Sequence, residues 1–94
     1  MKFLAIEKEL KLIDGNNKSV ILAEEARAVF ELYKKGIIRE IYFNENNCAV
    51  IILECESLED SKEFLNLLPL VTKQYISFEI MKLNPYTGLE SLME

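Results

Sequence analysis

Residues 36–56, GIIREIYFNENNCAVIILECE, decide the fold of this chain, because they contain two strands joined by a tight turn. The strands are expected at 37–44 and 48–55, with the polar segment 45–47 between them. The second strand is apolar at nearly every position and does not alternate, which indicates that both of its faces are covered. One layer of helices covers one face only. We therefore expect a second copy of the chain to cover the other face.

The turn of this hairpin leaves two registers open. A two-residue type I′ turn at 46–47 places Arg39 directly opposite Glu54. A three-residue loop shifts the pairing by one residue and moves Glu54 opposite Ile38, onto the face of Glu40. We expect the two-residue turn, because asparagine tolerates the positive φ angles that this turn requires.

Composition places the chain among small globular proteins and excludes several classes of partner. The 94 residues suffice for one domain, which we assign to 1–94, and 50% of them are hydrophobic. The net charge is -5 and the longest basic run is two lysines, which argues against nucleic-acid or membrane-surface partners. There is no apolar run long enough for a membrane span or a signal peptide, so a cytoplasmic location is expected.

The sequence contains few residues that could bind a metal ion or a cofactor. Cys48 and Cys55 lie seven positions apart on one predicted strand, hence on opposite faces and about 23 Å apart. The chain has no histidine and no C-x-x-C motif. We expect no metal site and no cofactor, and we interpret the two cysteines as small core residues.

The residues before the hairpin predict a strand and a helix. A strand is expected at 1–6, followed by a connection at 8–18 with a turn signal at 14–17. A helix is expected at 20–35, ended by Gly36 in a left-handed C-terminal cap. Acidic residues near the start of this helix and lysines in its last turn complement the helix dipole; they are Glu24, Glu25, Lys34 and Lys35. Its buried stripe is expected at Ala23, Ala26, Val29, Phe30 and Tyr33.

The residues after the hairpin predict a second helix, a last strand and a tail. Ser57 and Asp60 have the spacing of an N-terminal capping box, and Pro69 ends the helix that they open. The last strand is expected at 73–83. The tail at 84–94 carries apolar residues at helical spacing, and it packs either on its own sheet or on a partner subunit.

The order of elements is therefore β-α-β-β-α-β, the split βαβ or ferredoxin-like arrangement of the α+β class. It gives a four-stranded antiparallel sheet with two helices on one face and with the first and third strands in the centre. The other face is a large apolar surface, which predicts association. Two such sheets packed face to face form a dimeric α+β barrel, so the expected partner is the chain itself, as a homodimer or a higher homo-oligomer.

Four short runs carry a resemblance to a known group of proteins. They are IREIYF at 38–43, AVIILE at 49–54, LPLV at 68–71 and FEIMKLNPYTG at 78–88. Together they resemble uncharacterised members of the muconolactone isomerase-like group of dimeric α+β barrel proteins. The resemblance implies this fold, homo-oligomerisation, and a cofactor-free isomerase or lactone-handling activity on a small carbonyl or carboxylate metabolite. Of the isomerase's basic and aromatic residues on the second strand, only Arg39 and Tyr42 have matches here.

Without histidine, acid–base chemistry falls to carboxylates, tyrosines and lysines. The candidate catalytic residues are Arg39, Glu54 and Glu79, in a cleft between two sheets where the arginine binds an oxyanion and a glutamate moves a proton. Tyr42 and Tyr86 are the candidate ligand-binding residues. The alternative interpretation makes Arg39 and Glu54 a cross-strand ion pair worth about 0.2–1 kcal/mol.

Two classes of function stay open at this point. The first is an enzyme of the isomerase or lactone-handling type. The second is a non-catalytic homodimeric module that binds a small molecule. Residue types and spacing do not decide between them, because one fold hosts many functions.

Overall fold

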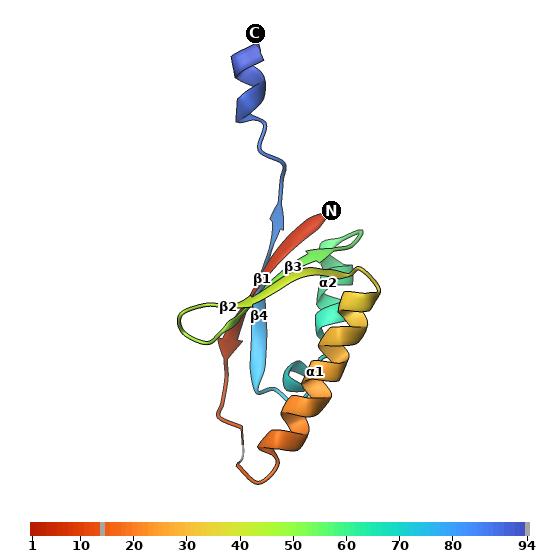
Figure 1. Cartoon of the computed structure of the whole chain (residues 1–94), viewed down its shortest axis with the longest axis vertical. Helices are drawn as coiled ribbons and strands as arrows, with labels where there is room; N and C mark the ends of the chain where they lie inside the picture. The colour runs from red at the N-terminus through yellow and green to blue at the C-terminus, as the bar shows by residue number, and fades with distance from the viewer. Residues whose placement is uncertain (14, 94) are drawn as a thin grey trace.

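The computed structural model describes residues 1–13 and 15–93 and confirms the ferredoxin-like order (Figure 1). The sheet has four strands in the order β2-β3-β1-β4, and each neighbouring pair is antiparallel, so β1 and β3 are central as expected. The elements are β1 (Lys2–Glu9), α1 (Lys18–Lys34), β2 (Ile38–Phe43), β3 (Ala49–Glu54), α2 (Leu58–Leu65), α3 (Pro69–Thr72), β4 (Ile76–Leu83) and the 3-10 helix η1 (Gly88–Met93).

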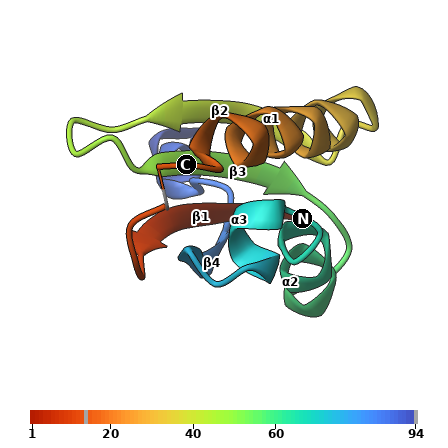
Figure 2. The same cartoon turned by 90° about the horizontal axis from the view of Figure 1, so that it is seen from below.

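The helices lie on one side of the sheet, where they bury the main core. In Figure 2, α1 lies beside β2 and β3, and α2 and α3 lie towards β1 and β4. Alternation along the strands directs Phe3, Ala5, Ile51 and Leu53 to this side, and all four are at most 1% exposed. They pack in one cluster with apolar residues from α1 and α2.

The opposite side of the sheet, which we call the open face, has no helix over it. Its apolar residues are half-buried or exposed where those of the helix side are buried. The register places them in adjacent rows across β3, β1 and β4. They are Val50, Ile52, Leu4, Ile6, Met81 and Leu83. Within one chain, β3 is therefore covered on one face only.

The hairpin has the wider of the two turns considered from the sequence, so the expected two-residue turn is wrong. The N–H of Asn44 donates to the carbonyl of Cys48 at 2.9 Å, which leaves residues 45–47 as a three-residue loop. Asn47 takes the positive φ of 59°. The side-chain oxygen of Asn44 closes this loop, because it accepts from the N–H groups of Asn46 and Cys48.

A bulge in β2 removes the expected pairing of Arg39 with Glu54. The pairs Glu40↔Ile52 and Ile38↔Leu53 flank it, so Arg39 has no partner residue on β3. Glu54 instead pairs with Lys2 of β1.

Helix α1 begins two residues earlier than predicted and buries a different stripe. Gly36 follows it with φ 77°, as expected for a left-handed cap. The fully buried residues of α1 are Ile21 and Leu32, whereas Phe30 and Tyr33 are more than half exposed. The helix carries apolar residues around most of its circumference, so spacing alone did not distinguish its buried side from its exposed side.

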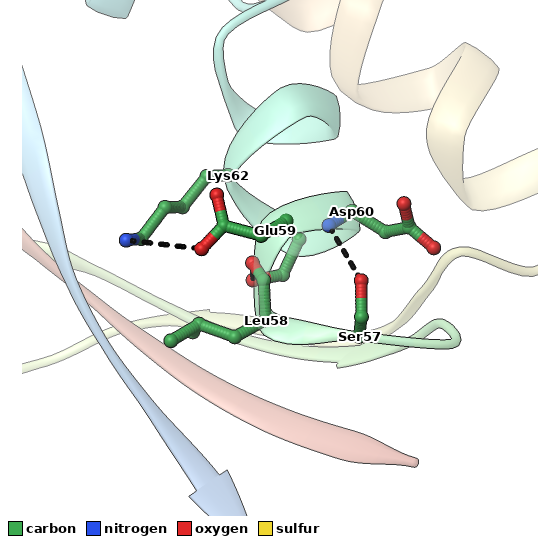
Figure 3. A network of polar contacts seen from close by, with 6 residues as sticks. Ser57, Leu58, Glu59, Asp60 and Lys62 are labelled. Atoms are coloured by element: carbon green, nitrogen blue, oxygen red, sulfur yellow. Dashed lines mark hydrogen bonds and ion pairs between the residues drawn. The ribbon is translucent and has the colours of Figure 1, made fainter.

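The predicted cap of the second helix is confirmed. Figure 3 shows the hydroxyl of Ser57 accepting from the N–H of Asp60 at 3.0 Å, and the ion pair of Glu59 with Lys62 at 3.8 Å. Helix α2 ends at Leu65, and Pro69 occupies the first turn of the short helix α3.

The ends of the connections differ in detail from the sequence expectations. Strand β1 continues to Glu9, and β4 begins only at Ile76. Of the expected turn at 14–17, Asp14 lies outside the described residues. The tail after Leu83 extends away from the sheet (Figure 1), and its apolar residues Tyr86, Leu89 and Leu92 are 64–79% exposed. No described helix is long and apolar enough to cross a membrane.

Candidate ligand cavity between α1 and the sheet

A cavity of about 880 Å³ lies between α1 and the helix side of the sheet. Its walls are mainly apolar and come from α1, from all four strands and from α3. Its lining includes both Ile51, which is fully buried, and Leu12, which is 80% exposed, so it opens to solvent. The volume lies within the range of small-molecule sites, about 300–1,000 Å³.

The first carboxylate in this cavity comes from β1. Glu7 continues the alternation of Phe3 and Ala5, so its side chain is directed to the helix side. Its Oε1 accepts a hydrogen bond from the N–H of Ala49 at 3.1 Å. The paired residues of β1 and β3 end at Ile6↔Val50, so the glutamate satisfies a backbone donor just beyond the ladder.

The second carboxylate comes from the middle of α1. Oε1 of Glu25 accepts from the N–H of Leu70 at 3.0 Å, one of the free donors at the start of α3. Burial raises the pKa of Glu25, the hydrogen bond from Leu70 lowers it, and the negative charge of Glu7 raises it, with a raised pKa as the net result. Each glutamate uses one oxygen for a backbone donor.

This pair of carboxyl groups has the composition of an acid–base site. Among the described residues, neither Glu7 nor Glu25 forms an ion pair with a lysine or arginine. The raised pKa of Glu25 lets it keep its proton to a higher pH than a free glutamate does. Such a pair can give a proton to one atom of a ligand and take one from another.

The catalytic candidates proposed from the sequence, Arg39, Glu54 and Glu79, lie apart from one another, on the open face and at the edges of the sheet. Within the described residues, no hydrogen bond or ion pair involves the side chain of Arg39. Oε2 of Glu54 lies 3.1 Å from the amino group of Met1, and this buried oxygen has no hydrogen-bond partner of good geometry beyond that ion pair. Glu79 lies on the edge strand β4, opposite Ile6.

Glu54 and Glu79 do not meet within one chain. Glu54 pairs with Lys2, and Glu79 pairs with Ile6, four residues further along the same central strand. With two strand spacings between β3 and β4, the two positions are about 16 Å apart. Tyr42 lies at the other edge of the sheet from Glu79, across three strand spacings or about 14 Å.

The two tyrosines proposed for ligand binding have different surroundings. The side chain of Tyr42 lies on the open face, in the row of Val50, and its hydroxyl donates to Oε1 of Glu40 at 2.9 Å. Tyr86 lies in the tail and is 79% exposed. Of the five candidates, only Tyr42 borders the cavity, and its side chain belongs to the open face. The sequence analysis did not select Glu7 or Glu25, the carboxylates that the fold brings together there. In the described part of the chain, no group of three or more potential ligands is placed to hold a metal ion.

Comparison with known proteins places the fold. No protein-family model matches the chain, and no curated protein is significantly similar to it in sequence. Among solved structures, muconolactone isomerase is similar with a TM-score of 0.79 and 20% identity over 94% of this chain and 93% of that chain. A complex of 5-chloro-2-hydroxyhydroquinone dehydrochlorinase from Burkholderia phenoliruptrix AC1100 with 2,5-dihydroxybenzoquinone is similar with a TM-score of 0.64 and 15% identity, over 94% of this chain and 98% of that chain. The chain therefore has a ferredoxin-like fold similar to that of muconolactone isomerase.

Proposed function

We propose that this protein is a cofactor-free enzyme of the isomerase or lactone-handling type, acting on a small carbonyl or carboxylate metabolite. The observation that carries the proposal is the pair Glu7 and Glu25 in an apolar cavity of about 880 Å³. The likeness in fold to muconolactone isomerase supports it, because that enzyme's name describes the same class of reaction. The two similar structures contribute the fold, and the cavity contributes the chemistry.

The proposed reaction moves one proton between two carbon atoms. Glu7 takes a proton from a carbon next to the carbonyl or conjugated with it, the C–H electron pair moves towards the carbonyl oxygen, and Glu25 gives its proton to that oxygen. The enol then returns its O–H proton to Glu25 while Glu7 delivers its proton to a different carbon. All atoms are conserved, and no oxidant, reductant or second substrate is consumed. The raised pKa of Glu25 suits it to the role of acid.

The functional unit that we propose is a homodimer or a larger homo-oligomer. The open face of one copy packs against that of a second copy, and the tail after Leu83 covers the neighbouring subunit. In that assembly Arg39, Glu54, Glu79 and Tyr86 border a second, inter-sheet cleft. The location that we propose is the cytoplasm.

Proton exchange tests the proposed chemistry without knowledge of the natural substrate. We expect the protein to catalyse exchange into D2O, or double-bond migration, in a set of unsaturated lactones and β-keto acids followed by NMR. Glu7→Gln and Glu25→Gln should each lower the rate by about 10²-fold or more, since either loss removes one partner of the proton transfer. Glu24→Gln is the matched control, because Glu24 is adjacent on α1 but lies outside the cavity lining and pairs with Lys73.

Two results would overturn parts of this proposal. If Arg39→Ala abolishes exchange while both glutamine variants retain it, the reaction takes place in the inter-sheet cleft. If no compound in the set is turned over although several bind, the second candidate function holds, a non-catalytic module that binds a small molecule. One observation favours that candidate: both glutamates accept hydrogen bonds from backbone N–H groups, as structural glutamates do.

A further inference from the structure

We infer that the cavity selects uncharged carbonyl compounds and excludes carboxylates from its inner end. This inference rests on the proposed function for the kind of ligand, but it concerns binding and is measured without turnover. The ligand that we infer for this chain is uncharged and therefore differs from an anionic lactone.

The inner end of the cavity is negatively polarised. Glu7 and Glu25 both line it, and they are close enough for the charge of one to act on the other. Their surroundings are apolar side chains such as Val29, Ile51 and Phe78. A carboxylate about 6 Å from one such charge, at an effective dielectric constant of about 20, binds roughly 100-fold more weakly than an uncharged group of the same shape.

The positive charges of the cavity are at its mouth. Its described lining contains two lysines, Lys11 and Lys18, and no arginine, and the exposed Glu9 adds a third carboxylate to the lining. The ammonium of Lys11 lies 4.8 Å from the centre of the Tyr75 ring, and Lys18 is an exposed residue at the first position of α1. A ligand that places its carboxylate at these lysines keeps that end in the solvent-exposed part of the cavity.

An uncharged ring carbonyl fits the inner end in each respect. Its ring contacts the apolar walls, and its oxygen accepts a hydrogen bond from the protonated carboxyl group of the pair. A volume of about 880 Å³ holds a five- or six-membered ring with a substituent. Charge therefore decides between ligands that have similar size and shape.

The test compares two lactones that share one unsaturated five-membered ring. β-Angelica lactone carries a methyl group and is uncharged, whereas muconolactone carries a carboxymethyl group on the same ring carbon and is an anion at pH 7. Binding to the full chain is measured by calorimetry and ligand-observed NMR, and isomerisation of each compound is followed separately by NMR. We expect the uncharged lactone to bind at least about 10-fold more tightly. The double variant Glu7→Gln with Glu25→Gln should reduce that ratio to near one, whereas Glu24→Gln should leave it unchanged.

The outcomes separate this inference from the proposed function. Preferential binding of β-angelica lactone without isomerisation supports the inference and counts against the enzyme. Equal or tighter binding of muconolactone to the wild-type chain overturns the inference, even if the compound is isomerised. A preference that persists in the double glutamine variant also overturns it, because the two carboxyl groups are then not its cause. If neither lactone binds at a concentration of about 10 mM, the inference is overturned as well.

Discussion

Oε1 of Glu25 in α1 accepts a hydrogen bond at 3.0 Å from the backbone N–H of Leu70 in α3, 45 residues further along the chain. This contact joins the long helix to the short one at the inner wall of the cavity. It orients the carboxyl group through one of its two oxygens. The residue therefore has a structural contact and a proposed chemical role, and the two can be separated by substitution.

The first prediction separates them through stability. Glu25→Ala should lower the free energy of unfolding by about 1–3 kcal/mol, because Leu70 is buried and its N–H loses its acceptor. Glu25→Gln should cost much less, since its amide oxygen can accept the same bond. Urea unfolding monitored by circular dichroism measures both. Glu24→Ala is the control, expected to cost at most about 1 kcal/mol, because its ion pair with Lys73 is long and exposed. Equal costs for Glu25→Ala and Glu25→Gln would show that the hydrogen bond contributes little.

The second prediction concerns pH. Burial and Glu7 raise the pKa of Glu25 above its reference value of 4.5, so the folded protein binds this proton more tightly than the unfolded chain does. The stability from this group is fully present below pH 4.5 and is lost as the pH rises through the raised pKa of the folded state. The stability of wild type relative to Glu25→Gln should therefore fall as the pH rises above 4.5, measured by urea unfolding in constant salt. A difference that stays constant or grows with pH would contradict the raised pKa.

The third prediction compares two glycines that both have room for a Cβ but differ in backbone conformation. A Cβ added at Gly36 or at Gly15 meets no atom within 4 Å, but only Gly36 has a positive φ, of 77°. Gly36→Ala should cost about 1–2 kcal/mol through left-handed strain. Gly15→Ala should stay within about 0.5 kcal/mol of wild type, as surface substitutions usually do. The midpoints of urea unfolding measure the loss of stability in each variant. Equal losses at both sites would show that the left-handed conformation of Gly36 is not their cause.

The order of the elements was predictable because its signals are local. Gly36 after an apolar helix and Ser57 three residues before Asp60 are short-range patterns, and both have the structure that they predict. The hairpin register was not predictable in this way. It depends on the side chain of Asn44 bonding to the loop and on the bulge at Arg39, neither of which changes the period-two pattern.

The cavity carboxylates escaped the sequence analysis because each has an ordinary local explanation. Glu7 interrupts an apolar strand, and Glu25 was interpreted as complementing the dipole of a helix that in fact begins at Lys18, beyond one turn away. Their hydrogen bonds span 42 and 45 residues, so only the folded chain brings them together. Spacing alone could have indicated that both glutamates lie on the buried sides of their elements. Glu7 continues the alternation of Phe3 and Ala5, and Glu25 follows the buried Ile21 by four positions.

The last prediction concerns the tail, whose apolar residues need a surface that their own sheet does not provide. Leu89, Leu92 and Met93 are 64%, 79% and 87% exposed, and the open face of the sheet is apolar as well. We expect the full chain to be a dimer or larger, by light scattering behind a sizing column at several concentrations. Deletion of residues 84–94 should weaken the assembly and leave the monomer folded, because the described tail residues bury no apolar side chain in the core.

Two further samples make the tail experiment decisive. Leu89→Asp with Leu92→Asp keeps the length of the tail and removes its apolar stripe, so it should weaken the assembly as the deletion does. Ile52→Lys, in the middle of the open face, should abolish face-to-face packing even with the tail intact, because it would place a charge in an apolar interface. An unchanged mass after deletion would exclude the tail from the interface. A wild-type mass of 10.9 kDa at all concentrations would remove the proposed oligomer and its inter-sheet cleft, and leave the cavity beneath α1 as the site to pursue.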